Sequence, residues 1–224
     1  LDSHSVDALA LQDRGFELSV QNMFEIDCRS PLEGLFEAMH IKARQPLRRA
    51  QEKFSVNVVR DPYQFIHYYL QNLAKVGARN RLDWSKFPAL FEACQAKESG
   101  EILSATWPDG RHAAMVFLVW DHGKMYYLLA TRTREEGDVG SANLLIWEGM
   151  KRAHARGLVF DLDCITTDGA TTFLSGFNGV PKMRIFARRA SLGYNLVHLA
   201  KRHLICNPLR GHSSKRERRN VGLA

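Results

Sequence analysis

The pattern of hydrophobic and polar positions changes along the chain, and the first half is mainly of the helical type. Residues 15–28 alternate only loosely, and they predict one strand or a broken hairpin. After them, Ser30-Pro31-Leu32-Glu33 combines a capping box with a proline at the first helical position, which predicts a helix start. Apolar side chains at helical spacing extend this helix to about Lys53, and basic side chains occupy its other face.

Two more helices follow a short strand that is predicted at residues 54–59. Asp61 is an N-cap residue with Gln64 three positions later, so a helix begins there, and Gly77 suits its end. A further helix is predicted over about residues 85–96, where apolar side chains share one side. The first half is therefore mostly helical.

The second half begins with three strand-like runs. They cover residues 101–107, 112–120 and 124–133, and the turn sequences at 108–110 and 121–123 separate them. Runs joined by such short turns pair antiparallel, so the pattern predicts a three-stranded meander. The middle run is apolar on both faces and should be covered on both sides.

The chain then continues through a crossover. A helix is expected over about residues 143–156, a strand over 158–163, a short helix over 168–177 and a last strand over 184–190. A strand reached through a helix in the same sheet normally lies parallel to the strand before it. The predicted fold class is α/β with a mixed sheet, in which an antiparallel meander joins a parallel strand–helix–strand crossover and helices pack on the sheet.

Composition places the chain among ordinary globular proteins. It has 224 residues, of which 45% are hydrophobic and 25% charged, and this length buries a core without cross-links. No run approaches the roughly 18 apolar residues of a membrane span, and no signal peptide is visible. These features favour a cytoplasmic location. The first residue is Leu, so we interpret the sequence as a processed or truncated form.

Cysteines and histidines do not indicate a metal centre. The four cysteines lie far apart without a C-x-x-C pair, and we interpret them as free thiols in a reducing cytoplasm. The nine histidines form no ligand pairs at metal spacing, so no metal is expected. The net charge is +7, and residues 215–219 form a basic tail. Such a tail is either a solvated end or a contact for nucleic acid or a membrane surface.

The segment between the meander and the crossover helix raises a question of its own. Residues 133–143 are polar, contain glycines and open directly into the helix, an arrangement in which backbone N–H groups bind phosphate. The same segment carries Glu135, Glu136 and Asp138, whose charges oppose an anion. Two interpretations stay open: a site for a nucleotide-like ligand, and a corner that binds no phosphate.

Four motifs occur in an order and spacing that are typical of a known group. They are the basic helix Met39 to Ala50, which reads K-x-R-x-x-x-R-x-A from Lys42, and the stretches 142–148, 157–161 and 173–181. This set resembles the FemAB-like group, which holds the Fem-type peptidyltransferases and acetyltransferase domains found with polysaccharide biosynthesis genes. The order of elements likewise resembles the GNAT acyltransferase fold, in which two parallel strands splay apart and receive acyl-CoA.

The resemblance implies acyl-CoA, for example acetyl-CoA, as the co-substrate, with no metal. Its pyrophosphate would lie on the loop and helix start, and the implied binding residues are Arg134, Gly137, Gly140, Ser141 and Asn143. From the residues alone, Asn143 is either the helix N-cap or a direct ligand contact. The resemblance also implies a partial first GNAT-like subdomain at 1–100, a complete acyltransferase domain at 101–203 and a flexible basic tail at 204–224.

Amide formation from an activated acyl donor needs a base for the amine and a hydrogen-bond donor for the oxyanion. Asp161 and Asp163 are two apart on a predicted strand and share a face. They are candidate general bases, or acids paired with arginine at the strand end. Tyr126 is a candidate general acid, and strand tyrosines also serve in packing. Tyr126 and Tyr127 point to opposite faces, so only one of them faces the cleft.

Basic side chains supply candidate contacts for the acceptor. Arg44, Arg48 and Arg49 would either grip a phosphate-bearing acceptor or be solvated, and the spacing of four places Arg44 and Arg48 on one helix face. Such an acceptor is a nucleotide-sugar or a lipid-linked sugar. Lys182 adds a cation after Pro181. Leu174 stands where Fem-type members often carry a lysine tied to substrate or transition-state charge.

Three functions follow from these observations. The first is acyl transfer, from acyl-CoA to an amino group of a cell-envelope or exopolysaccharide precursor. The second keeps the fold and changes the donor to aminoacyl-tRNA, which the positive net charge supports because tRNA binding depends on phosphate neutralisation. The third is a GNAT-like binding module without catalysis, which the acidic loop suggests.

Overall fold

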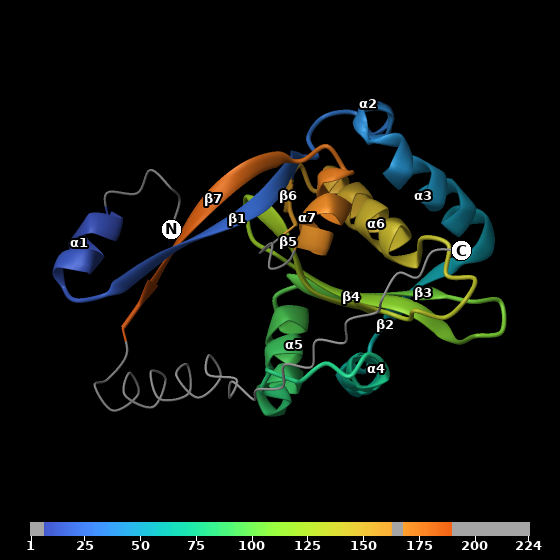
Figure 1. Ribbon diagram of the computed structural model, residues 1–224, viewed down its shortest axis with the longest axis horizontal. Helices are drawn as coiled ribbons and strands as arrows, with labels where there is room; N and C mark the ends of the chain where they lie inside the picture. Colours follow the sequence, from blue (N-terminus) through green and yellow to red (C-terminus); the bar gives the residue numbers. More distant parts are fainter. Residues whose placement is uncertain (1–6, 163–167, 190–224) are drawn as a thin grey trace, which may run out of the picture. The chain divides into compact units, whose positions relative to one another are not determined.

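Figure 1 shows the computed structural model, which describes residues 7–162 and 168–189. Its centre is one seven-stranded mixed sheet of order β2-β3-β4-β5-β6-β1-β7. The strands are β1 (Glu17–Asp27), β2 (Ser55–Val59), β3 (Gly100–Thr106), β4 (His112–Trp120), β5 (Lys124–Arg132), β6 (Val159–Asp161) and β7 (Val180–Arg188). The helices are α1 (Asp7–Asp13), α2 (Leu32–Ala38), α3 (Ile41–Lys53), α4 (Pro62–Lys75), the 3₁₀ turn η1 (Trp84–Lys86), α5 (Phe87–Ala96), α6 (Ser141–Ala155) and α7 (Asp168–Ser175). The mixed α/β fold class is thus confirmed.

The described residues divide into two compact units. Residues 20–186 form the larger unit, which contains the sheet and the helices α2 to α7. The smaller unit comprises, of the described residues, 7–19 and 187–189, and therefore holds α1 and the outer ends of β1 and β7. All the sites considered below lie within the larger unit.

The predicted meander is confirmed. β3 pairs antiparallel with β4, and β4 pairs antiparallel with β5. The pairing of β4 with β5 shifts between Phe117 and Leu118, and Leu128 has no partner at that point. Such a β-bulge bends a strand and increases its twist. The bulge therefore lies in the part of β5 that runs beyond β6.

The parallel crossover is confirmed as well, and it is short. β5 and β6 pair in parallel at only three positions, from Lys124 with Val159 to Tyr126 with Asp161. β6 ends at Asp161, whereas β5 continues to Arg132. The second half of β5 thus has no neighbour on the β6 side among the described strands, so the two central strands part there.

Strands from both ends of the chain complete the sheet. β1 pairs antiparallel with β6, for example Ile26 with Phe160, and lies between β6 and β7. β2 pairs antiparallel with β3 at the other end of the sheet. The division at residue 100 into two subdomains remains a prediction, and the sheet itself draws strands from both sides of that residue.

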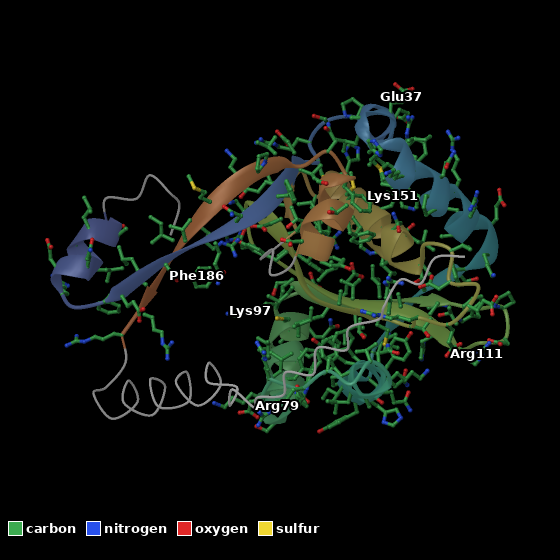
Figure 2. All side chains as sticks on the ribbon, in the orientation of Figure 1. Glu37, Arg79, Lys97, Arg111, Lys151 and Phe186 are labelled. Carbon is green, nitrogen blue, oxygen red and sulfur yellow. The ribbon has the colours of Figure 1, made fainter. Side chains whose placement is uncertain are left out.

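Helices cover both faces of the sheet, as the apolar middle strand predicted. α3 and α6 pack on one face, and α4 and α5 on the other (Figure 1). Figure 2 shows side chains filling the space on both sides of the sheet. The central residues of β4 are fully buried between the two layers, among them Met115 on one side and Val116 on the other. The burial of apolar side chains on both faces is the main stabilising contribution.

The prediction of one long helix from Leu32 to Lys53 is wrong. It is two helices, because Met39 and His40 adopt extended backbone conformations. The N–H of His40 donates to the carbonyl of Gly176, 2.8 Å away, and the imidazole of His40 caps α3 by accepting from the N–H of Lys42. The predicted capping box is also wrong, because Pro31 is the N-cap residue and has no side-chain cap hydrogen bond. A tertiary hydrogen bond thus interrupts a pattern that is helical throughout.

The other predicted segments agree with the structure within a few residues. Asp61 caps α4 by accepting from the N–H of Tyr63, as expected. The last strand, β7, begins four residues earlier than predicted, at Val180. None of the helices in the described ranges is long and apolar enough to cross a membrane.

Candidate active site

A cavity of about 500 Å³ opens where β5 and β6 part. Its walls come from the second half of β5, from the start of β4, from Leu162 after β6, from the start of α6, and from α7 and α4. Most of the lining is apolar, and it includes Leu129, Ala130, Phe173 and Leu174. A concave, largely apolar cavity with a few polar groups is the usual form of a small-molecule site. The splay of the two strands therefore produces the best candidate site.

Tyr127, and not Tyr126, faces this cavity. Tyr127 lines it, and among the described residues its hydroxyl makes no hydrogen bond. Burial raises the pKa of Tyr127, so its phenol stays protonated. Tyr126 is not part of the lining. Its hydroxyl donates to Oδ2 of Asp121 at 3.0 Å, and burial followed by this hydrogen bond raises the pKa of Tyr126 to about 12. The position of Tyr126 gives no support to its predicted role as a general acid.

The structure describes one of the two carboxylates that were predicted as general bases. Asp161 is fully buried, and its Oδ2 accepts from Nη2 of Arg184 at 2.5 Å. This ion pair joins the end of β6 to β7 across the intervening β1, which agrees with the interpretation as an arginine-paired acid. Asp163 lies outside the described residues, two positions after Asp161. A role of either carboxylate as general base stays a prediction.

The start of α6 is capped by a carboxylate of the same loop. Gly140 is the N-cap residue, with a φ of 111°, and α6 begins at Ser141. Oδ1 of Asp138 accepts from the N–H groups of Gly140 at 3.3 Å and Ser141 at 3.0 Å. The interpretation of Asn143 as N-cap is wrong, because Asn143 is the third helical residue. Its amide donates instead to the carbonyl of Ala43 on α3 at 3.3 Å.

The loop is also in direct contact with α3. A Cβ built on Gly140 would lie 2.7 Å from the carbonyl oxygen of Pro46 and 2.8 Å from its Cβ. Gly137 has a φ of 92°, and its carbonyl accepts from Nζ of Lys53 at 2.9 Å. Two of the predicted cofactor-binding glycines therefore hold the loop against α3.

The acids of this loop are largely compensated. Glu135 forms ion pairs with Lys75 and with Arg111, which lies at the β3–β4 turn and is labelled in Figure 2. These partners, Lys75 first, hold the pKa of Glu135 below its usual range. Asp138 pairs with Arg132 at 3.3 Å. The electrostatic objection to an anion near this loop is therefore weaker than the sequence suggests.

A second pocket, of about 330 Å³, lies between this loop and α3. It is lined by Gly140, Asn143 and Asp138 from the loop and helix start, and by three basic side chains, Lys42, Arg49 and Arg132. Arg132, Ala142 and Phe173 line both this pocket and the apolar cavity, so the two adjoin. A basic pocket thus lies beside the apolar one.

The other basic residues singled out in the sequence lie elsewhere. Arg48 is exposed, with its guanidinium over the ring of Phe36. Arg44 is half-buried, and its Nε has no hydrogen-bond partner among the residues that the structure describes. Arg134 lines a separate pocket beside α4. Lys182 is exposed on β7, and it lines neither the apolar cavity, nor the basic pocket, nor the pocket beside α4. The acceptor roles of Arg44, Arg48 and Lys182 therefore stay predictions.

Comparison with known proteins decides the family. Residues 39–171 match the family model described as "Acetyltransferase (GNAT) domain". The chain belongs to this GNAT family. No curated protein sequence matches it. The expected GNAT-type acyltransferase is thus confirmed, and the expected resemblance to the FemAB-like group is confirmed in fold by FemX.

Solved structures agree on the fold. FemX aligns with a TM-score of 0.69 at 14% identity, covering 89% of this chain and 72% of FemX. L-PGS from Bacillus licheniformis aligns with a TM-score of 0.55 at 13% identity, covering 87% of this chain and 69% of that one. A C-terminal domain from Agrobacterium fabrum, assigned to the lysylphosphatidylglycerol synthetases, aligns at 0.60 with 18% identity, covering 93% and 73%. At these identities the likeness concerns the fold alone.

Sequence reasoning did not select Tyr127 or Lys42 as residues of the site, and it assigned Arg49 to the acceptor rather than to the pocket beside the loop. Lys42, Pro46 and Arg49 are spaced i, i+4 and i+7, which places them on one face of α3. The sequence shows this spacing, but it does not show which face of α3 is turned toward the loop.

Proposed function

We propose that this chain transfers an acyl group from an acyl thioester, acyl-CoA, to a primary amine. The observation that carries the proposal is the apolar cavity at the splay of β5 and β6, with a basic pocket beside it. The cavity suits an acyl chain and the pantetheine arm. The basic pocket suits the phosphates of the same molecule. A cytoplasmic location, and a cell-envelope or exopolysaccharide precursor as the acceptor, are the finer parts of this proposal.

The reaction needs three events at the thioester carbonyl. The amine, after losing a proton to a base, attacks the carbonyl carbon and a C–N bond forms. The carbonyl oxygen carries negative charge in the tetrahedral intermediate and needs a hydrogen-bond donor. The C–S bond then breaks, and the departing thiolate takes up a proton. Acid and base are therefore both required near the parted strands.

Tyr127 is the residue that we assign to the acid step. Its phenol lines the cavity, and among the described residues its hydroxyl makes no hydrogen bond, so it is available to donate a proton to the departing thiolate. The predicted base is Asp163, which follows Leu162 of the cavity wall by one residue. Asp161 is a weaker candidate, because its carboxylate is already paired with Arg184.

Calorimetric titration with acyl-CoAs of increasing chain length tests this proposal. Each buried CH₂ contributes about 0.8 kcal/mol, so butyryl-CoA, with two more CH₂ groups, should bind up to roughly fifteenfold more tightly than acetyl-CoA. The substitution Ala142→Phe places a ring where the cavity and the basic pocket meet, and it should abolish binding. Ala155→Phe is the matched control, because Ala155 is exposed at the far end of the same helix.

Two outcomes would contradict the proposal. The first is the absence of binding to every acyl-CoA, and the second is unchanged binding in Ala142→Phe. Tyr127→Phe should lower kcat by about 10²-fold with little change in KM if Tyr127 is the acid. Tight binding of acyl-CoA without transfer to any amine would instead favour the binding module.

Aminoacyl-tRNA is the second candidate donor. It is favoured by the net charge of +7 and by the likeness in fold to FemX. Leu174 opposes it, because a buried leucine lines the cavity where Fem-type members often carry a lysine. Binding of charged tRNA that weakens steeply with salt, together with no binding of acyl-CoA, would favour this donor.

A further inference from the structure

Two of the backbone N–H groups at the start of α6 are already engaged. Asp138 accepts from the N–H groups of Gly140 and Ser141, and its carboxylate occupies the position that an anion would take at a helix start. A negative ligand at the same place would have to displace this cap and would meet its charge. The loop alone is therefore a poor phosphate site in this chain.

Cations from α3 and β5 lie next to that place. Lys42 and Arg49 extend from one face of α3, and Arg132 ends β5. Pro46, between the two α3 cations, packs against Gly140 and so fixes their distance from the loop. The pocket that these residues line has three basic side chains and one carboxylate, a formal charge of +2.

Two of the three basic side chains that line this pocket are available to bind a ligand. Arg132 is paired with Asp138. Neither Lys42 nor Arg49 has an ion-pair partner for its side chain within the described ranges. Both side chains are exposed, so they are solvated and able to turn toward a ligand. Exposed cations of this kind are usual on helices, but here they line a pocket that adjoins the apolar cavity.

We propose that the diphosphate of the acyl donor is held by the side chains of Lys42, Arg49 and Arg132, and not by the amides of the α6 start. This inference rests on the proposed function, because it assigns the phosphates of the same donor. Arg132, Ala142 and Phe173 form the wall shared by the pocket and the cavity, so one molecule reaches both. Charge-assisted hydrogen bonds from these side chains to phosphate are about twice as strong as neutral ones.

The assignment has a consequence for donor choice. Acetyl-CoA carries the diphosphate, whereas acetyl-pantetheine has the same thioester and no phosphate. The wild-type chain should bind acetyl-CoA at least about a hundredfold more tightly than acetyl-pantetheine, since acetyl-pantetheine loses the contacts of the diphosphate with all three basic side chains. Rising salt should weaken the binding of acetyl-CoA and leave that of acetyl-pantetheine nearly unchanged.

The test compares both donors in four variants. Lys42→Ala and Arg49→Ala should each weaken acetyl-CoA binding about tenfold and leave acetyl-pantetheine binding unchanged. Lys97→Ala is the control of equal charge change, because Lys97 is exposed next to α5, which covers the other face of the sheet (Figure 2). It should leave both donors unaffected. Asp138→Asn keeps the shape of the cap, removes its charge and should tighten acetyl-CoA binding severalfold.

The outcomes separate this inference from the function on which it rests. If the wild-type chain binds neither donor, the proposed function fails. If it binds both equally, or if Arg49→Ala weakens both equally, the function stands and the phosphate assignment is wrong. A nucleoside diphosphate sugar is the last probe. If its binding requires Lys42 and Arg49 and does not compete with acetyl-CoA, the pocket belongs to the acceptor and the inference is overturned.

Discussion

Replacement of Gly140 by alanine tests the contact between the loop and α3 directly. Gly140 has a φ of 111° and a ψ of 29°, a backbone conformation that side chains rarely adopt. The added Cβ would lie 2.7 Å from the carbonyl oxygen of Pro46, and backbone atoms do not move out of the way as a flexible side chain does. Both the conformation and the contact therefore oppose the substitution.

The two effects give the expected size. A non-glycine residue held in this region costs about 1–3 kcal/mol. Overpacking against a fixed neighbour costs about 1–3 kcal/mol more. The free energy of unfolding should thus fall by about 3–5 kcal/mol in Gly140→Ala. Gly157→Ala is the matched control, because Gly157 has a φ of 65° and no atom within 4 Å of the added Cβ. That variant should lose only about 1 kcal/mol.

Urea unfolding followed by tryptophan fluorescence measures the difference. With an m-value of about 2 kcal/mol per molar urea, the midpoint of Gly140→Ala should fall at least about 1 M below that of Gly157→Ala. Equal midpoints would refute the reasoning, because the conformational cost alone would then explain both variants. A shift of Pro46 in the folded variant should also weaken donor binding, since Lys42 and Arg49 flank it on α3.

The remaining predictions concern buried ionisable groups. Asp161→Ala leaves Arg184 without its buried partner and should lower the free energy of unfolding by about 3 kcal/mol in thermal unfolding; a loss below about 1 kcal/mol would contradict the burial of this pair. Tyr126 has a pKa raised to about 12 by burial and by its hydrogen bond to Asp121, so its proton is bound more tightly in the folded state. Stability should therefore fall as pH rises from about 10 to 12, and this part of the slope should vanish in Tyr126→Phe; an unchanged slope would be evidence against the shift. Cys28 is buried and free, and burial raises the pKa of its thiol to about 12. Alkylation followed by peptide mapping should find Cys28 protected at neutral pH in the folded chain and modified after unfolding, whereas rapid modification in the folded state would contradict its burial.

The elements themselves were largely readable from the sequence. The apolar run of β4, the turns on either side of it and the caps of Asp61 and Gly157 depend on neighbours within a few residues. Local periodicity and capping chemistry describe such features well. The parallel arrangement of β5 and β6 was also readable, because a helical crossover of this length leaves few alternatives.

Errors arose where a distant part of the chain competed with a local signal. The helix break at Met39 and His40 follows from a hydrogen bond to Gly176, which lies far along the sequence. Asn143 has a side chain suited to capping, but α6 begins two residues earlier, where Asp138 accepts from the N–H groups of Gly140 and Ser141, and the amide of Asn143 donates to Ala43. Neither of these long-range hydrogen bonds can be inferred from the local sequence pattern.

The sequence by itself determined the order of strands and helices, the mixed sheet and the resemblance to an acyltransferase family. The elements depend on the spacing of apolar residues and on caps, and the resemblance depends on short motifs; all of these are local features of the sequence. Only the tertiary structure decided which side chains form the site. Tyr127 rather than Tyr126 faces the cavity, and Lys42 with Arg49 rather than Arg44 with Arg48 faces the loop. The physical reason is that a face of a strand or helix becomes functional only through what packs opposite it, and that partner is set by the whole fold.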